Sequence, residues 1–259
     1  MSIRPFYEQD GITIYHGDCR DASQVIPIGW ADYISADPPY GETSLDWDKW
    51  PFNWAENISA ILKPTGSMWC FGTLRMFIEK SHQFSAFKMS HEIIWEKHNG
   101  SGFHVDRFRR VHEIVAHFYP LGSKWAEVYK SPQFTMDATA RTVRRKSKPA
   151  QWHGKTGPTV YISHDGGPRR MRSVIRVRSC HGDALNETQK PEGIVRPLME
   201  YACRSGGNVF VPFVGSGTDL VVARELGMRA IGFEIRQEQC EVAAKRLKQG
   251  ILFGTEAHA

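Results

Sequence analysis

The sequence predicts an α/β fold in which helices cover a mostly parallel sheet. Short apolar runs alternate with stretches of helical periodicity, and several of these runs end at a carboxylate or a glycine turn. The chain has 259 residues, which is enough for one large α/β domain with an insertion. Between residues 120 and 183 the alternation stops. We therefore expect a sheet domain formed by 1–119 and 184–259, with an insertion at 120–183 between its two halves.

Gly and Pro residues divide the first half into strands and helices. Residues 11–18 alternate apolar and polar positions before a Gly-Asp turn, which is typical of a strand. Pro51 suits the first turn of a helix that reaches Leu62, and the stretch 63–66 ends that helix. We expect further strands at 31–36, 67–71, 91–96 and 111–119, a short helix or turn at 21–26, a helix at 74–84 and a polar loop at 97–110.

The same alternation returns after the insertion. We expect helices at 193–203, 220–226 and 237–249, a strand from 208 that runs into a glycine-rich turn at 215–217, and a strand at 229–235. The last helix has Cys240, Ala243, Ala244 and Leu247 on one face. The insertion has only short strand candidates, at 159–162 and 173–177, so we expect it to form a small lobe outside the sheet.

Asp37-Pro38-Pro39-Tyr40 directly follows the strand predicted at 31–36. Ligands of open α/β sheets bind at the carboxyl ends of strands, so this tetrapeptide has the position of a binding site. Its two prolines keep the backbone extended and remove two N–H donors, which leaves the carbonyls of Asp37 and Pro38 without their usual local partners. A carboxylate, a free carbonyl and an aromatic face suit an amino-purine or amino-pyrimidine, because they supply two hydrogen-bond acceptors and a ring for stacking.

A second candidate site follows the strand that starts at 208. Gly215 and Gly217 form a turn before a helix, where backbone N–H groups can approach a ligand closely. The turn lacks the Lys and the third glycine of nucleotide-phosphate motifs. Glu234 lies 17 residues after Gly217, near the interval at which a carboxylate binds ribose hydroxyls in dinucleotide folds. A nucleoside ligand without a pyrophosphate fits both observations, and S-adenosylmethionine is such a ligand.

Basic residues concentrate in the predicted insertion. The whole chain has a formal net charge of +5, but residues 141–178 contain eleven Lys and Arg against one acid, Asp165. Aromatic residues such as Trp152 and Tyr161 lie among them, and the combination favours contact with nucleic acid over a merely solubilising surface. Which of the candidate side chains touch phosphates and which read bases stays open. The candidates are Arg144, Arg145, Lys146, Lys148, Arg169, Arg170 and Arg172.

The cysteine and histidine patterns favour neither disulfides nor a metal site. The five cysteines are scattered and include no C-x-x-C pair, which indicates reduced thiols in a cytoplasmic protein. The eleven histidines show no H-x-x-x-H or H-E-x-x-H spacing. No apolar run approaches the length of a membrane span. We expect a cytoplasmic protein without a metal, associated with the nucleoid when it binds DNA.

In combination, these stretches resemble the β-class (permuted) S-adenosylmethionine-dependent DNA amino-methyltransferases of the adenine-N6 type. In that family the Asp-Pro-Pro-Tyr motif precedes a target-recognition insertion, and the Phe-x-Gly-x-Gly motif comes last. Five stretches of this chain also match in order, namely Gly17-Asp18, Leu62-Lys63-Pro64-x-Gly66, Thr188-Gln189-Lys190-Pro191, Pro212-Phe213-x-Gly215-Ser216-Gly217-Thr218 and Gly232-Phe233-Glu234. Two positions depart from the pattern, because Val211 stands where the family usually has Asp and Asp219 where a second Thr is common.

The resemblance implies a circularly permuted, Rossmann-like methyltransferase sheet. It assigns a catalytic half to 1–119, a target-recognition region to 120–183 and a cofactor-binding half to 184–259. It further implies transfer of a methyl group from S-adenosylmethionine to the exocyclic N6 of an adenine flipped out of double-stranded DNA. Relatives are often dimers, so a homodimer is expected.

The resemblance also implies roles for individual residues. The acceptor site is Asp37, Pro38, Pro39 and Tyr40, in which Asp37 and Pro38 accept the two N–H bonds of the amine and Tyr40 stacks on the base. The cofactor site, with Glu234 on the ribose, Asp18 on the adenine edge and Lys190 on the carboxylate, comprises Asp18, Asp37, Lys190, Phe213, Gly215, Ser216, Gly217, Thr218 and Glu234. From the residues alone, Asp18 could instead cap the following turn, and Glu234 could be a solvated acid.

Three other functions stay open. A cytosine-N4 methyltransferase would use the same chemistry, although those enzymes tend to have Ser before Pro-Pro-Tyr. An RNA or protein-amide methyltransferase shares this kind of tetrapeptide, but the permuted order and the basic insertion fit duplex DNA better. A catalytically inactive DNA-binding protein would have a damaged cofactor site, whereas Asp37, Tyr40, Gly215, Gly217 and Glu234 are all present here.

Overall fold

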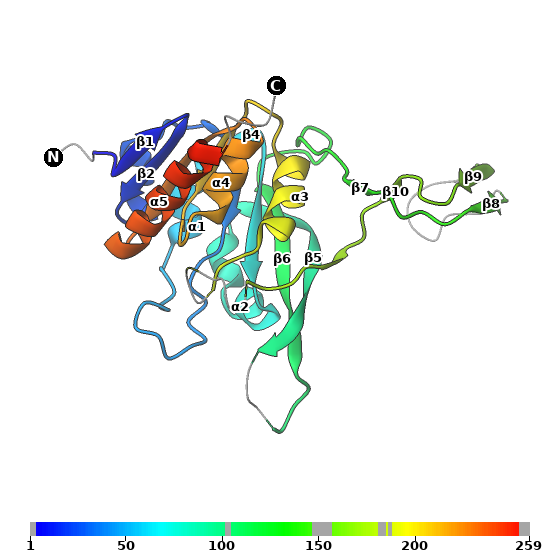
Figure 1. Cartoon of the computed structure of the whole chain (residues 1–259), viewed down its shortest axis with the longest axis horizontal. Helices are drawn as coiled ribbons and strands as arrows, with labels where there is room; N and C mark the ends of the chain where they lie inside the picture. Colours follow the sequence, from blue (N-terminus) through cyan, green and yellow to red (C-terminus); the bar gives the residue numbers. More distant parts are fainter. Residues whose placement is uncertain (1–3, 102–104, 147–156, 181–184, 186–187, 254–259) are drawn as a thin grey trace. The chain divides into compact units, whose positions relative to one another are not determined.

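The computed structural model describes residues 4–101, 105–146, 157–180, 185 and 188–253 of the chain. Within these residues the main feature is a nine-stranded sheet with the strand order β1-β2-β13-β12-β3-β4-β6-β5-β11 (Figure 1). The strands are β1 (Tyr7–Gln9), β2 (Ile12–His16), β3 (Ala31–Ala36), β4 (Leu62–Gly72), β5 (Phe87–Ser101), β6 (Arg110–Pro120), β11 (Val174–Arg176), β12 (Asn208–Val211) and β13 (Arg229–Glu234). The five strands β2, β13, β12, β3 and β4 run parallel, which confirms the predicted α/β sheet.

The strand order brings distant parts of the chain to one edge of the sheet. β12 lies between β13 and β3, and all three are parallel. Parallel strands end at the same edge, so the residues that follow them meet there. Asp37 comes directly after β3, the turn at Gly215 follows β12, and Glu234 ends β13. The two motifs singled out in the sequence therefore lie at one edge of the sheet.

Helices cover both faces of this sheet. They are α1 (Trp54–Ser59), α2 (Leu74–Glu79), α3 (Glu192–Ala202), α4 (Thr218–Glu225) and α5 (Gln237–Phe253), with 3-10 turns η1 (Cys19–Gln24) and η2 (Ser81–Phe84). α3, α4 and α5 lie side by side on one face (Figure 1). On the other face Trp54 and Phe84 pack with Ile34 and Met68 in an apolar core. No helix within the described residues has the length and apolarity needed to cross a membrane.

Two predicted helices are shorter than expected. The stretch 63–66, predicted to end the first helix, lies inside β4. A Cβ at Gly66 would lie 2.7 Å from the carbonyl oxygen of Asp32, so the close pairing of β4 with β3 requires a glycine there. The helix predicted over 74–84 divides at Lys80 into α2 and η2.

Part of the polar loop predicted at 97–110 is strand. β5 continues to Ser101 and β6 begins at Arg110, and these two residues are paired. The ends of β5 and β6 extend beyond the other strands as a two-stranded ribbon (Figure 1). The end of β5 has the polar residues Lys97, His98 and Asn99 in succession, so the apolar alternation that usually indicates a strand is missing from this part.

Residues Pro132–Arg172 form a compact unit of their own. Two antiparallel pairs build it, β7 (Phe134–Thr135) with β10 (Arg169–Arg170) and β8 (Arg141–Arg145) with β9 (Thr159–Ser163). The unit is narrower than the predicted insertion at 120–183. The strand predicted at 173–177, which we expected outside the sheet, is β11 and pairs with β5 in the main sheet. The roles assigned to the three segments stay predictions.

Candidate active site

A cavity of about 1130 Å³ opens at the edge where the parallel strands end. Ligand sites usually measure roughly 300–1,000 Å³, so this cavity has room for more than one small ligand. All but one of the predicted residues of the acceptor and cofactor sites line it, namely Asp18, Asp37, Pro38, Pro39, Tyr40, Lys190, Phe213, Gly215, Ser216, Thr218 and Glu234. Gly217 does not. A Cβ at Gly217 would lie 2.8 Å from the Cβ of Ala243, so this glycine allows α4 to pack on α5.

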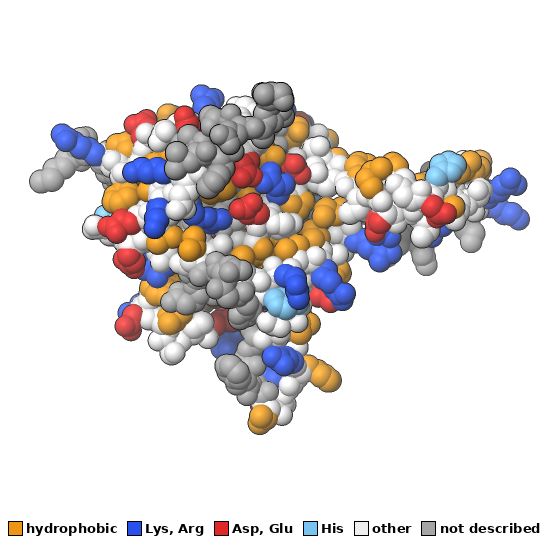
Figure 2. Space-filling model, viewed as in Figure 1, with side chains coloured by type: hydrophobic (Ala, Val, Ile, Leu, Met, Phe, Trp, Pro, Cys, Tyr) orange, Lys and Arg blue, Asp and Glu red, His pale blue; other side chains and the backbone are white. Residues whose placement is uncertain are grey.

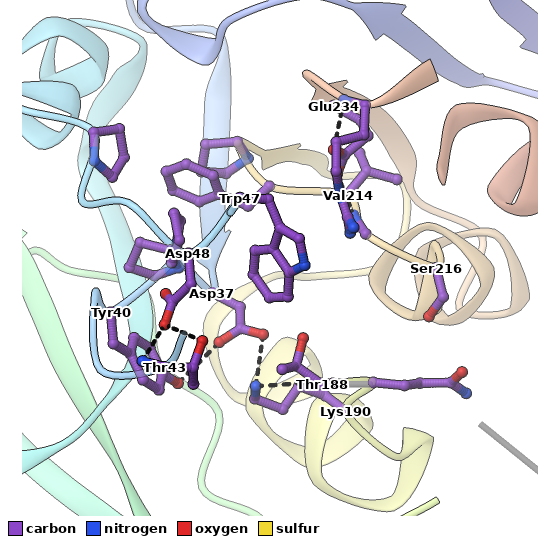
Figure 3. Close-up of a pocket in the computed structure, with 18 of the residues that line it drawn as sticks. Asp37, Tyr40, Thr43, Trp47, Asp48, Thr188, Lys190, Val214, Ser216 and Glu234 are labelled. Carbon is purple, nitrogen blue, oxygen red and sulfur yellow. Dashed lines mark hydrogen bonds and ion pairs between the residues drawn. The ribbon is translucent and has the colours of Figure 1, made fainter. Parts of the chain in front are cut away.

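Asp37 is held from two sides at the end of β3 (Figure 3). Lys190 Nζ donates to Asp37 Oδ2 at 2.6 Å, and the Tyr40 hydroxyl donates to Oδ1 at 3.0 Å. Burial raises the pKa of Asp37; the charge of Lys190 opposes this rise, and the charge of Glu113 adds to it. Asp37 is therefore a carboxylate with a raised proton affinity that lines the cavity.

Lys190, for which the resemblance implies a contact with the cofactor carboxylate, pairs with two carboxylates of the protein, and the cofactor contact stays a prediction. Its Nζ also lies 3.5 Å from Oε2 of Glu113, a residue of β6, and its side chain is only 7% exposed. Lys97 of β5 forms an ion pair with the other carboxylate oxygen of Glu113. Asp37, Glu113, Lys97 and Lys190 thus form a largely buried cluster with two negative and two positive charges, which is how charges withdrawn from water are normally tolerated.

Glu113 and Lys97 were missed by the sequence reasoning. Lys97 lies in the predicted polar loop, and Glu113 lies in a predicted strand that contains no candidate site residue. One signal was available, because Glu113 is an acid within the largely apolar run 111–119. Buried acids within sheets are rare unless they are paired, so that position indicated a nearby cation.

The loop that follows Tyr40 is organised by Asp48, which was not predicted either. Its carboxylate accepts hydrogen bonds from the backbone N–H groups of Gly41, Glu42 and Thr43 at 2.7–3.0 Å and from the Thr43 hydroxyl. Burial alone would raise the pKa of Asp48, but these hydrogen bonds outweigh burial and lower it. The carboxylate therefore fixes the loop beside the acceptor motif (Figure 3).

Glu234 is bound by backbone on both carboxylate oxygens. The N–H of Gly215 donates to Oε2 at 2.8 Å, and the N–H of Arg236 donates to Oε1 at 2.9 Å. Gly215 has a φ of 51°, the left-handed conformation that favours glycine. Glu234 is 7% exposed, so the alternative of a solvated strand-end acid is wrong. Two lone-pair positions of the carboxylate stay available for a ligand.

Asp18 serves as a cap, in agreement with the alternative considered from the sequence. Its Oδ1 accepts from the backbone N–H of Arg20 at 2.9 Å at the start of η1. The Arg20 guanidinium also donates to both carboxylate oxygens and lowers the pKa of Asp18. The side chain still lines the cavity, and its contact with a ligand stays a prediction.

Asp219, one of the two departures from the family pattern, is buried at the cavity wall. The Ser35 hydroxyl donates to its Oδ1 at 2.5 Å, and the Tyr33 hydroxyl donates in turn to Ser35 Oγ at 3.0 Å. Burial raises the pKa of Asp219 to about 6. Among the described residues, no group of three His, Cys, Asp or Glu side chains is arranged to hold a metal ion.

The predicted DNA contacts all belong to the compact unit Pro132–Arg172. Arg144, Lys146, Arg170 and Arg172 are exposed, whereas Arg169 is partly buried and pairs with Asp137. Lys148 and the side chain of Arg145 lie outside what the structure describes. Figure 2 shows Lys and Arg side chains gathered around this unit.

Solved structures with similar folds include a DNA methyltransferase. The PvuII DNA methyltransferase, described as cytosine-N4-specific, aligns with a TM-score of 0.65 and 12% identity over 99% of this chain and 91% of that chain. The complex of M1.HpyAVI with S-adenosylmethionine aligns with a TM-score of 0.58 and 22% identity over 91% and 99% of the two chains. These similarities confirm the methyltransferase fold predicted from the sequence.

Sequence comparison adds the family. The Type II methyltransferase M.HinfI of Haemophilus influenzae is 27% identical over 92% of this chain and 68% of its own length. The Type II methyltransferase M2.LlaDCHI of Lactococcus lactis subsp. cremoris is 25% identical over 98% of this chain and 96% of its own length. A family model described as DNA methylase, covering N6 and N4 enzymes, matches residues 31–245. With most of its length matched, the chain belongs to the N6/N4 DNA methylase family.

Proposed function

We propose that this protein transfers a methyl group from S-adenosylmethionine to the exocyclic N6 of an adenine in double-stranded DNA. One observation carries the proposal: the acceptor motif Asp37–Tyr40 and the glycine turn with Glu234 line the same cavity. Methyl transfer needs both ligands in contact, and a shared cavity of this size supplies that proximity without a covalent intermediate.

The residues around Glu234 fit the cofactor. Its carboxylate retains two acceptor positions, which suit the two hydroxyls of a ribose. Phe213 supplies an apolar wall, and Gly215 lets the backbone approach closely. When bound, S-adenosylmethionine supplies an electrophilic methyl group on a sulfonium.

The acceptor motif fits an exocyclic amine. The nitrogen lone pair of such an amine is delocalised into the ring, so the protein must favour the pyramidal form by accepting both N–H bonds. We assign one acceptor to the Asp37 carboxylate and the other to the Pro38 carbonyl, with Tyr40 stacked on the base. The raised pKa of Asp37 suits it to receive the proton that the amine releases as its new N–C bond forms. Extrusion of the base from the duplex costs a few kcal/mol.

Asp37 supports adenine as the target base, because the related N4 enzymes tend to have Ser at this position. The circular permutation is supported by the order along the chain, in which β3 and its motif precede β12 and the glycine turn. A cytosine-N4 activity is the second candidate, since a cytosine-N4-specific enzyme shares the fold.

The basic unit Pro132–Arg172 supports DNA as the partner. Exposed Arg and Lys side chains there would neutralise phosphates, so binding should weaken as salt is raised. We further propose a homodimer and a cytoplasmic enzyme that associates with the nucleoid through DNA. Light scattering of the free protein would test the dimer, because a monomer mass would contradict it.

Incubation with methyl-labelled S-adenosylmethionine and unmethylated DNA tests the function, with Asp37→Ala as the control. We expect label in N6-methyldeoxyadenosine after digestion to nucleosides, and almost none from the control over the same time. Label in N4-methylcytosine would keep the mechanism and change the base. No label in DNA, despite measurable cofactor binding, would overturn the proposal.

A further inference from the structure

Lys190 has two carboxylate partners and little access to water. Its Nζ lies 2.6 Å from Asp37 Oδ2 and 3.5 Å from Glu113 Oε2. With 7% exposure, the ammonium cannot move into solvent without a larger rearrangement. A buried ammonium that leaves one carboxylate must therefore be received by another. Glu113 is the neighbouring group in the described part of the chain that is placed to receive it.

The proposed reaction requires Lys190 to move from Asp37 to another carboxylate. The Asp37 carboxylate is expected to accept an N–H of the target amine, but its Oδ2 already binds Lys190 and its Oδ1 the Tyr40 hydroxyl. The amine nitrogen becomes positively charged as it gains the methyl group. An ammonium held on the same carboxylate would repel this charge strongly at the low effective dielectric of a buried site.

Glu113 is held in place to receive both donors. Lys97 binds its Oε1, which leaves Oε2 toward Lys190. The Tyr40 hydroxyl lies 3.3 Å from the same Oε2, so it too can turn from Asp37 to Glu113. β6 pairs with β5, where Glu113 is opposite Trp95, and this register fixes the position of its backbone. Burial would favour a neutral Glu113, but Lys190 and Lys97 outweigh it and lower its pKa, so the group stays an anion.

We propose that Glu113 is a positioning residue for methyl transfer, which takes over Lys190 and the Tyr40 hydroxyl when the target amine binds Asp37. The inference rests on the proposed function. Glu113 does not touch the reacting atoms, and it acts by leaving Asp37 free for the amine. The four-charge cluster stays neutral in both arrangements, since Lys190 only changes its partner.

Glu113→Gln tests this role, because the amide keeps the size and the acceptor for Tyr40 but loses the charge that holds Lys190. We expect the single-turnover methylation rate to fall about 10- to 100-fold, with the affinity for S-adenosylmethionine unchanged. The matched control is Glu96→Gln on β5, an acid that pairs with Arg176 and lies outside the cavity lining, and it should methylate at the wild-type rate.

A second pair of variants separates positioning from folding. Lys97→Met alone should lower the rate less than Glu113→Gln does, because Glu113 loses the cation that holds it but can still receive Lys190. Lys97→Met with Glu113→Gln removes one charge of each sign and should fold as the single variant does, yet lose the same 10- to 100-fold as Glu113→Gln. Lys190→Met should make the Glu113→Gln change nearly silent, since the two residues act together.

These experiments distinguish failure of the Glu113 inference from failure of the proposed function. Wild-type activity with an equally active Glu113→Gln variant would overturn this inference and leave the function intact. Additive effects of Glu113→Gln and Lys190→Met would also overturn it. Absence of methylation by the wild type would overturn the proposed function and this inference together.

Discussion

Two carboxylates at the same edge of the sheet are held in different ways. Glu234, at the end of β13, accepts from the backbone N–H groups of Gly215 and Arg236. Asp37, after β3, accepts from the side chains of Lys190 and Tyr40. Both line the cavity, and both are largely withdrawn from water. They differ in whether their partners can leave.

Backbone partners are fixed by the turn that presents them. The N–H of Gly215 cannot leave Glu234 unless the turn after β12 changes conformation. Side-chain partners can be exchanged by rotation about single bonds, and both donors of Asp37 have Glu113 within reach. The Glu234 end is therefore preorganised for one ligand, while the Asp37 end can switch between protein donors and a substrate amine.

Asp37→Ala tests the carboxylate whose side-chain partners can be exchanged. Removal of the acceptor is expected to lower the single-turnover rate on the order of 10³-fold, as for other groups that stabilise only the transition state. The affinity for S-adenosylmethionine should change less than the rate, because Glu234, Phe213 and Gly215 also line the cavity and keep their places in this variant. Calorimetry measures the affinity, and a large loss of cofactor binding would show that the two ends are coupled.

Glu234→Ala tests the carboxylate that is held by backbone N–H groups. The variant loses two acceptor positions for the ribose and leaves two backbone N–H groups without their partner, so cofactor affinity is expected to fall roughly 10- to 100-fold. Glu238→Ala is the control, since Glu238 is an exposed acid in the first turn of α5. Equal affinity for both variants would contradict a ribose contact at Glu234.

His117 does not line the cavity, so its effect on the pH dependence of stability can be measured separately from pH effects at the cavity. Burial lowers its pKa to about 3, against an ordinary value of 6.5. Between about pH 3 and 6.5 the unfolded chain binds a proton here and the folded protein does not, so stability should fall as the pH falls, by up to about 1.4 kcal/mol per pH unit. Melting temperatures across pH 4–7 measure this slope.

The matched variants are His117→Gln and His112→Gln, both in β6. The first should flatten the slope between pH 4 and 6.5 even if it lowers the melting temperature overall. The second changes an exposed histidine of the same strand and controls for the substitution itself. An unchanged slope in His117→Gln would assign the pH dependence to other groups.

The smallest expected effect is on cofactor binding and comes from the ionisation of Asp219, a third carboxyl group at the cavity wall. Its pKa of about 6 means that it gains its charge between about pH 5 and 7. An anion at the cavity wall attracts a sulfonium, so affinity for S-adenosylmethionine should rise roughly three- to tenfold across this window. Because the folded pKa lies above the ordinary value of 3.8, the unfolded chain loses this proton first, so stability should fall as the pH rises from about 4 to about 6.

Asp219→Asn should remove both pH dependences while the Ser35 hydroxyl keeps an acceptor. Binding by calorimetry at pH 5, 6 and 7 distinguishes the two proteins. If wild type and variant gave parallel profiles, the titration would belong to another group of the site.

The sequence alone determined the parts of the site that follow from local pattern. Asp37 and Glu234 were predicted at strand ends, and a parallel sheet brings the carboxyl ends of its strands to one edge whatever their separation in the chain. The glycine turn at 215–217 was also predicted, because it directly follows a predicted strand. Gly217 itself allows α4 to pack on α5 and does not line the cavity.

Only the tertiary structure decided which side chains hold Asp37. Lys190 lies 153 residues away in the chain, and Glu113 and Lys97 reach the site through the antiparallel register of β5 and β6. The same applies to β11, whose pairing with β5 returns a stretch of the predicted insertion to the main sheet. Register depends on contacts between distant strands, and a shift of one residue would turn Glu113 to the opposite face of the sheet. No local pattern carries that information, so the partners of the acceptor carboxylate became visible only in the folded chain.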